Sequence, residues 1–155
     1  MSESYIPEGY QHVIPYFAVK DAGAALDFYS RAFGASEVNR ITLENGVIAH
    51  AEMRIGDAVY MFSTASAEHG HLSAEDMGGS PVSFVIYVSD CDTSYSVALD
   101  EGAKGVMPPA DMFWGDRSAK VQDPFGYSWM LNTNKEKVSQ DEAQKRMRAL
   151  FAKAA

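Results

Sequence analysis

Three side chains in the first third of the chain carry groups that could bind a metal ion or move a proton. Residues 47–54 alternate in the manner of a strand, which puts His50 and Glu52 on one face. A second alternating run, 12–19, puts His12 and Tyr16 on one face. Imidazole nitrogens and carboxylate oxygens are ligands for zinc, iron and manganese. The spacing therefore admits a His12, His50 and Glu52 metal site, but an ordinary polar stripe with a hydrogen-bonded histidine has the same pattern.

Other chemical signatures are weak or missing. His69-Gly70-His71 lies in a polar, glycine-rich stretch, where a His-x-His sequence is more typical of solvated side chains than of ligands. The sequence has no Gly-x-Ser-x-Gly elbow, no phosphate-binding Gly-rich loop ending in Lys-Ser or Lys-Thr, and no Cys-x-x-Cys. The single cysteine, Cys91, excludes an intrachain disulfide and is predicted to be a buried thiol. We therefore predict no catalytic residue from motifs alone.

Composition limits the partners. The 155 residues fit one domain, and the 13 basic and 21 acidic residues give a net charge of −8. Nucleic acid and anionic membranes attract clustered Lys and Arg, so neither is expected as a partner. The first residues have neither a basic start nor an apolar run, and no stretch approaches the ~18 apolar residues of a membrane span. We expect a cytoplasmic protein.

The elements that must position these side chains form two similar series. The first, about 12–64, reads as a strand (12–19), a helix capped by Asp21 and closed by Gly34, and strands at 37–43, 47–54 and 58–63. After a linker at 65–81, the second series, about 82–134, reads as a strand (82–88), a helix, a strand near 104–107 and a hairpin. Asp90 or Asp92 caps the second helix. Val19-Lys20-Asp21 aligns with Val88-Ser89-Asp90 at an offset of 90 − 21 = 69 residues. The chain thus predicts a duplicated βαβββ module.

The second series closes on a hairpin with arms at 117–122 and 127–132. Asp123-Pro124-Phe125-Gly126 between the arms has the composition of a type I turn. The lead-in from Pro108 to Trp114 is predicted to be irregular. A last helix, about 139–153, begins with a capping box and carries an apolar stripe that should dock on the body of the protein or on a partner subunit.

The segment Phe113-Trp-Gly-Asp-Arg117, followed by Asp123-Pro-Phe-Gly-Tyr-Ser-Trp129, resembles the second half of the glyoxalase/bleomycin-resistance/dioxygenase superfamily, also called vicinal oxygen chelate proteins, and most closely its PhnB-like branch. The resemblance implies a single α+β domain whose two tandem βαβββ modules form a partly open, barrel-like cleft, and it implies a homodimer. It also implies a divalent metal held at positions that fall on Ile14, Tyr60, Ser83 and Met130. None of these residues is a metal ligand, so we predict no metal and no other cofactor.

The predicted cleft is aromatic and apolar, which suits a small planar or amphipathic molecule held by stacking and a few polar groups. The predicted ligand contacts are Tyr16, Tyr60, Phe62, Tyr87, Phe113, Trp114, Arg117 and Met130. The preferred hypothesis is a metal-independent protein that binds or sequesters such a molecule, as in resistance. A metal-dependent lyase, isomerase or dioxygenase using His12, His50 and Glu52, and a non-catalytic dimeric scaffold, remain alternatives.

Overall fold

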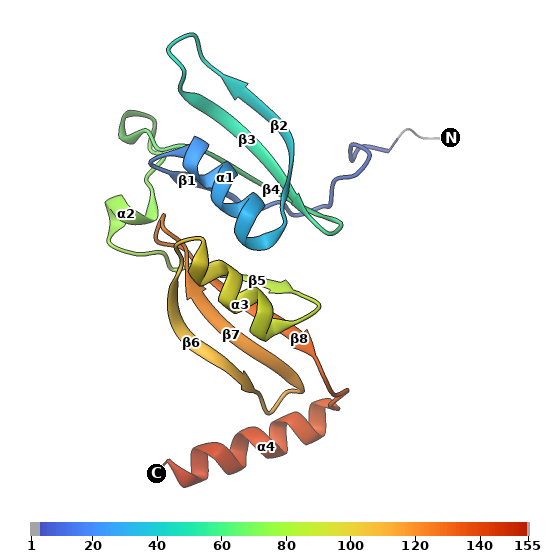
Figure 1. Cartoon of the computed structure of the whole chain (residues 1–155). Helices are drawn as coiled ribbons and strands as arrows, with labels where there is room; N and C mark the ends of the chain where they lie inside the picture. The colour runs from blue at the N-terminus through green and yellow to red at the C-terminus, as the bar shows by residue number, and fades with distance from the viewer. Residues whose placement is uncertain (1–3, 155) are drawn as a thin grey trace. The chain divides into compact units, whose positions relative to one another are not determined.

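The computed structural model describes residues 4–154 (Figure 1). The first half contains β1 (Tyr16–Val19), α1 (Ala22–Phe33), β2 (Ser36–Thr42), β3 (Ile48–Ile55), β4 (Ala58–Thr64), the short helix η1 (Ala67–His69) and α2 (Ala74–Met77). The second half contains β5 (Phe84–Tyr87), α3 (Cys91–Asp100), β6 (Lys104–Asp111), β7 (Asp116–Gln122), β8 (Ser128–Asn134) and α4 (Gln140–Lys153).

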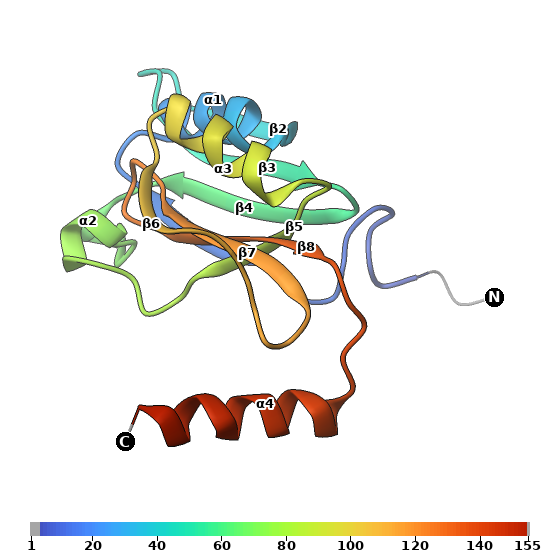
Figure 2. The same cartoon turned by 60° about the horizontal axis from the view of Figure 1, so that its bottom comes forward.

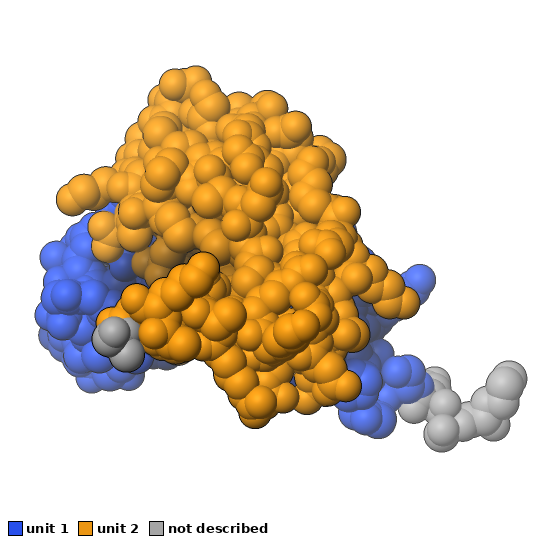
Figure 3. Space-filling view, turned by 90° about the horizontal axis from the view of Figure 1, so that it is seen from below, with its two compact units in different colours: residues 1–81, 124–127 blue, residues 82–123, 128–155 orange. Residues whose placement is uncertain are grey.

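The predicted duplication is confirmed by the sheet topology. One four-stranded sheet has the order β1-β4-β3-β2 and the other has the order β5-β8-β7-β6. In each sheet the first and last strands of the module are parallel neighbours, and the other pairs are antiparallel. The chain forms two compact units, residues 1–81 with 124–127 and residues 82–123 with 128–155 (Figure 3). The fold is α+β, with two βαβββ modules and a C-terminal helix.

Helix α1 covers one face of the first sheet (Figure 2). Asp21 caps it by accepting a hydrogen bond from the Ala24 amide at 2.9 Å, and Gly34 ends it at φ 66°, a left-handed conformation that glycine adopts without strain. Tyr29 of this helix is fully buried against a layer of aromatic rings. Its ring contacts are with Phe17, Phe28, Phe33, Tyr60, Phe62 and Phe125.

The turn between β7 and β8 belongs to the first compact unit. Its Phe125 ring meets Phe28 edge to face, and its Tyr127 ring lies 4.8 Å from Phe17. The Tyr127 hydroxyl also donates to the carbonyl of Ala18 at 2.7 Å. The predicted turn at 123–126 is present, and its aromatic residues are core residues.

Helix α3 covers one face of the second sheet. Cys91 at the start of this helix is 1% exposed, and its thiol donates to the Leu131 carbonyl, which confirms the predicted buried thiol. Trp129 stacks on Phe84 with 4.5 Å between ring centroids and donates from Nε1 to Asp123. The pairs Ala119–Leu131 and Val121–Trp129 complete this core.

Two segments differ from prediction. Strand β1 begins only at Tyr16, since Pro15 supplies no amide to a ladder and residues before it are held by side chains instead. The lead-in that was predicted to be irregular is largely strand, because β6 runs on through Pro108 and Pro109 to Asp111. β6 is an edge strand with shifts in register, a place where proline is tolerated.

The C-terminal helix α4 has no buried residue. Its Ser139 cap accepts from the Glu142 amide, and Arg146 bonds to the Phe113 carbonyl and to Glu136. Its apolar residues Met147, Leu150 and Phe151 are exposed, so the expected docking on the body of the protein is not seen. Figures 1 and 2 show the helix set off from the second sheet. No helix within residues 4–154 is both long and apolar enough to cross a membrane.

Candidate functional site

The first sheet has a far face, turned away from α1, which carries the polar side chains. Because Tyr60 and Phe62 contact Tyr29 of the helix, their neighbour Met61 points the opposite way. Met61 is paired with Tyr16 on β1 and with Glu52 on β3. The far face of the first sheet therefore contains Tyr16, His50, Glu52 and Met61.

Four side chains on or above this face form a continuous hydrogen-bonded row. The Tyr10 hydroxyl donates a hydrogen bond to Glu52 Oε2. His50 Nε2 lies 2.8 Å from Glu52 Oε1, and His50 Nδ1 lies 3.1 Å from the Tyr16 hydroxyl. A carboxylate only accepts hydrogen bonds, so the neutral imidazole carries its proton on Nε2 and accepts from Tyr16 through Nδ1. The Tyr16 and His50 rings are also stacked, with 5.6 Å between centroids.

The Glu52 carboxylate is ionised despite being buried. Glu52 is 7% exposed, and this burial alone would raise its pKa. Hydrogen bonds from Tyr10 and His50 outweigh burial and lower the pKa of Glu52 below the ordinary value of a glutamate. A folded-state pKa below the unfolded one means that ionised Glu52 adds stability above its unfolded pKa, and that this contribution disappears as pH falls through the folded pKa.

Replacing Glu52 by glutamine is expected to make the free energy of unfolding depend less steeply on pH in the acid range. The difference in unfolding free energy between wild type and Glu52→Gln should be largest near neutral pH and shrink below about pH 4, the ordinary range of a glutamate. Urea denaturation at a series of pH values measures it, and titration of other carboxylates cancels in the difference. A difference that stays constant down to the acid transition would show that Glu52 titrates normally.

The segment before β1 crosses the sheet and is tied down by side chains. Gln11 donates to the carbonyl of Val59 and accepts from its amide, and Arg54 donates to the Gly9 carbonyl at 2.9 Å. A cavity of about 530 Å³ lies between this segment and the far face. Its lining is mainly aromatic and aliphatic: Tyr5, Ile6, Pro7, Tyr10, Gln11, His12, Ile14, Glu52 and Met61.

A second cavity, of about 470 Å³, opens beside Tyr16. Its walls mix aliphatic residues with small polar ones and two histidines: Leu43, Val47, Ala49, Ser63, Thr64, Ala65, Ser66, His69 and His71, together with Tyr16. His69 is hydrogen-bonded to Ser66, and His71 meets Tyr16 edge to face. Tyr16 lines this cavity and Glu52 lines the other, so the hydrogen-bonded row links the two.

The residues do not fit the metal that the family resemblance implies. His50 and Glu52 are adjacent as predicted, but His12 lies beside Tyr5, with its Nε2 3.5 Å from that hydroxyl. Within residues 4–154, no three His, Cys, Asp or Glu side chains are grouped as metal ligands. Met61 occupies the far face at the position where Tyr60 was predicted, and its thioether is no ligand for such a metal either.

The predicted ligand contacts divide between the two faces of the first sheet. Tyr16 lies on the far face and lines a cavity, and its contact with a ligand stays a prediction. Tyr60 and Phe62 are 5% and 0% exposed and belong to the aromatic core beneath α1, so their predicted position on the ligand-facing surface is wrong. The prediction assigned the alternate residues of β4 to the wrong faces of the sheet. Met61 and Ser63, rather than Tyr60 and Phe62, lie on the same face as Tyr16.

In the second unit, Tyr87 and Met130 lie on the face of the sheet turned away from α3. Tyr87 donates to Asp116 at 3.0 Å. The Trp114 indole donates to the same carboxylate oxygen, and Asn134 donates to the other one at 2.8 Å. Asp116 is 3% exposed, so this carboxylate is solvated by three neutral donors rather than by water. Trp114, half-buried and in edge-to-face contact with Phe113, is thus anchored by its own unit.

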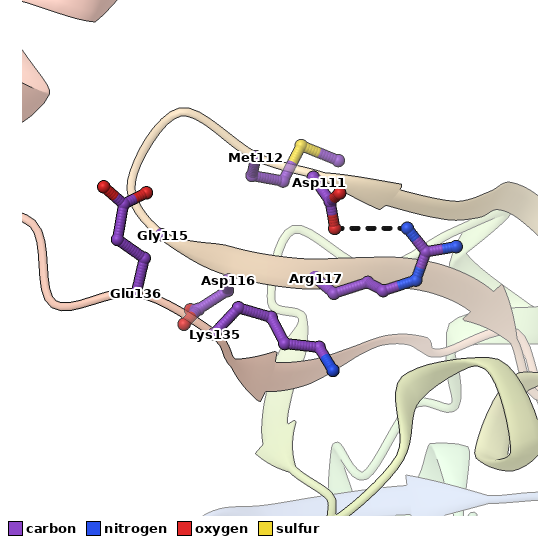
Figure 4. A pocket seen from close by; sticks show the side chains of 7 residues that line it. All are labelled: Asp111, Met112, Gly115, Asp116, Arg117, Lys135 and Glu136. Atoms are coloured by element: carbon purple, nitrogen blue, oxygen red, sulfur yellow. Dashed lines mark hydrogen bonds and ion pairs between the residues drawn. The ribbon is translucent and has the colours of Figure 1, made fainter.

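Arg117 faces the opposite side of β7 from Asp116. It bonds to both oxygens of Asp92, on α3, and to Asp111 at 3.1 Å. These two carboxylates raise the pKa of Arg117 further above its already high value. A cavity of about 470 Å³ beside it is lined by Asp111, Met112, Gly115, Asp116, Arg117, Lys135 and Glu136 (Figure 4). The guanidinium thus already has two carboxylate partners within its own unit, and its contact with a ligand stays a prediction.

Two buried side-chain oxygens in the second sheet have no hydrogen-bond partner. Ser118 Oγ and Asn132 Oδ1 are buried on the face that also carries Tyr87 and Met130, and the two residues are paired across β7 and β8. Neither was predicted. Alternation along β8 from Met130 would have indicated Asn132, whereas burial of a serine has no signature in sequence.

The chain belongs to the Glyoxalase/Bleomycin resistance protein/Dioxygenase superfamily. The family model matches residues 9–131, which reach from before β1 into β8. The curated "Uncharacterized protein Mb0911c" of Mycobacterium bovis is 35% identical over 136 residues, covering 86% of this chain and 90% of that protein.

Solved structures agree with this assignment. TioX from Micromonospora sp. ML1 is 25% identical, with a TM-score of 0.62 over 83% of this chain and all of that one. The PhnB protein from Bacillus cereus is 14% identical, with a TM-score of 0.61 over 79% of this chain and 99% of that one, which is a likeness of fold. The fold of the predicted family and branch is therefore shared.

Proposed function

We propose that the protein binds a small aromatic or amphipathic molecule on the far face of the first sheet. The observation that carries this proposal is the cavity beneath the N-terminal segment, whose lining includes Ile14 and Met61 together with the Glu52 carboxylate. Ligand sites are typically concave and apolar, with few polar groups that fix orientation. Because the superfamily includes bleomycin-resistance proteins, we propose that the protein sequesters the molecule it binds.

The charge of the site favours a cationic or neutral ligand over an anion. Glu52 is ionised, and the whole chain carries a net charge of −8. In the second unit, Tyr87 and Met130 remain proposed ligand contacts, and the unpaired oxygens of Ser118 and Asn132 would accept from a ligand donor or a water molecule. Phe113 and Trp114 remain proposals with less support, since Asp116 already holds Trp114.

Filling the first cavity should weaken binding of a suitable probe. We expect the planar cation proflavine to bind saturably, and Met61→Trp to weaken it by about tenfold or more, which is 1.4 kcal/mol. Fluorescence titration measures this, with neutral Nile red as a second probe. Met77→Trp on α2, where the side chain is 61% exposed, is the matched control and should leave binding unchanged. Saturable binding by neither dye, or binding indifferent to Met61→Trp, would refute the proposal.

Two further expectations stay proposals. A homodimer is supported by the family and by the uncovered apolar residues Met147, Leu150 and Phe151 of α4, which have no cover in the described part of the chain. A cytoplasmic location is supported by the sequence alone.

A further inference from the structure

The hydrogen-bonded row on the far face has an order that matters chemically. An ionised carboxylate, Glu52, accepts from one imidazole nitrogen of His50, and the other nitrogen accepts from the hydroxyl of Tyr16. Tyr16 is 45% exposed and lines the cavity beside β1, whereas Glu52 is buried. The Tyr16 hydroxyl, at the accessible end of the row, is therefore hydrogen-bonded to a base, the His50 imidazole. That imidazole is in turn hydrogen-bonded to the negatively charged Glu52 carboxylate.

We propose that Tyr16, His50 and Glu52 form a metal-independent proton relay that activates the Tyr16 hydroxyl toward a ligand in the adjacent cavity. In such a relay the carboxylate fixes the tautomer and orientation of the imidazole and stabilises the imidazolium that forms. Tyr10, which donates to the second oxygen of Glu52, is a positioning residue. The relay adds an activity to the proposed binding function, and its test needs no natural ligand.

The proton transfers balance without a cofactor. A ligand with an acidic X–H bond gives its proton to the Tyr16 oxygen, and the bonding electron pair stays on the ligand. Tyr16 passes its own proton to His50 Nδ1, which leaves an imidazolium beside the Glu52 carboxylate. The reverse transfers return a proton to the same or another atom of the ligand, so the reaction class is proton abstraction and isomerisation.

Burial and partner choice distinguish this row from an ordinary polar stripe. Among the described residues, His50 is the only group within ion-pair distance of Glu52 that can become positively charged, at 2.8 Å. Arg54, two residues further along β3, bonds to the Gly9 carbonyl instead. The Glu52 carboxylate is thus hydrogen-bonded by the His50 imidazole and by Tyr10. When His50 gains a proton, the imidazolium becomes the ion-pair partner of Glu52.

Tyr5 provides an internal comparison. Its hydroxyl also lies near an imidazole nitrogen, that of His12 at 3.5 Å, but within residues 4–154 no carboxylate is bonded to that imidazole. Tyr5 is 87% exposed, so accessibility alone would make it the more reactive tyrosine. Faster reaction at Tyr16 would have to come from the relay.

The experiment measures tyrosine labelling by a small arylsulfonyl fluoride, 4-(2-aminoethyl)benzenesulfonyl fluoride, followed by peptide mass spectrometry. The Tyr16 O–H bond breaks, its oxygen bonds to sulfur, fluoride leaves, and the proton passes to His50. We expect the labelling rate of Tyr16 to exceed that of Tyr5 by at least about tenfold. This threshold is modest, because a positioned general base typically accelerates a reaction by about 10²-fold or more. Glu52→Gln and His50→Phe should bring Tyr16 down to the rate of Tyr5, and Tyr10→Phe should reduce it partially.

Several controls keep the result decisive. The circular dichroism spectrum reports on the folding of each variant, the rate at Tyr5 reports on the activity of the reagent, and Tyr16→Phe confirms the labelled site. Should Glu52→Gln fail to fold, His50→Phe, which keeps a ring to stack on Tyr16, makes the same comparison. Labelling of Tyr16 no faster than Tyr5 in wild type, or unchanged in the folded variants, overturns the relay. Dye binding retained in either case would leave the binding function standing.

Discussion

Replacing Tyr29 by alanine is expected to lower the free energy of unfolding by about 3–5 kcal/mol, the range for removing a large aromatic side chain from a core. Tyr29 is fully buried and lies at the centre of the aromatic layer between α1 and the first sheet, where Tyr60 and Phe62 pack against it. Truncation removes these contacts and leaves a cavity that rigid neighbouring rings fill poorly. Urea denaturation followed by circular dichroism measures the loss.

The matched control is Tyr5→Ala, because the same atoms are removed from a side chain that is 87% exposed. It should change stability by no more than about 0.5 kcal/mol, as surface substitutions usually do. A loss below about 1 kcal/mol for Tyr29→Ala, against the range for buried aromatic residues, would mean that this aromatic layer is not the core of the unit.

Replacing Asp116 by alanine should destabilise the second unit by about 2–3 kcal/mol, since donors in a poorly solvated site are left without an acceptor. The carboxylate accepts from Tyr87, Trp114 and Asn134 and is 3% exposed. Tyr87 itself is exposed and can turn to water, so the cost stays below the sum for three buried donors. Chemical denaturation measures stability, and a change in tryptophan emission, to which Trp129 also contributes, accompanies release of the Trp114 indole.

Asp116→Asn is the matched control, because it keeps the shape and one acceptor oxygen but removes the charge and the second acceptor. It should cost less than alanine and keep part of the Trp114 anchoring. Wild-type stability in Asp116→Ala would contradict the structural role assigned to this carboxylate. It would also return Trp114 to the group of side chains free to contact a ligand.

Local signals in the sequence predicted most of the fold. The Asp21 cap, the Gly34 terminus and the Asp123–Gly126 turn act over a few residues, so each can be read without knowing what packs against it. The offset between Asp21 and Asp90 indicated duplication, and both modules have the same strand order. Such features depend on backbone chemistry more than on tertiary contacts.

The face of a strand is harder to predict when both faces are apolar. In β4, Tyr60 and Phe62 alternate with Val59 and Met61, so alternation fixes which residues share a face but not which face meets the helix. In β3 the alternation of polar and apolar residues is clearer, and His50 and Glu52 were correctly predicted to be neighbours. The candidate site was therefore identified in part.

The remaining residues of the site come from contacts distant in sequence. Tyr10 reaches Glu52 across 42 residues and Gln11 reaches Val59 across 48. Neither contact has a local signature, because the segment before β1 has no regular structure and is placed only by the sheet it crosses. The ion pair between Arg117 and Asp92 could not be predicted from the sequence for the same reason.

Chemical-shift mapping of the isotopically labelled protein, titrated with proflavine, tests the central claim most directly. If the far face of the first sheet is the ligand site, the largest amide shifts will fall on β3 and β4 around Glu52 and Met61 and on the segment containing Tyr10 and Gln11. Shifts confined to β7, β8 or α4, with the first unit unchanged, would contradict the account and move the site to the second unit.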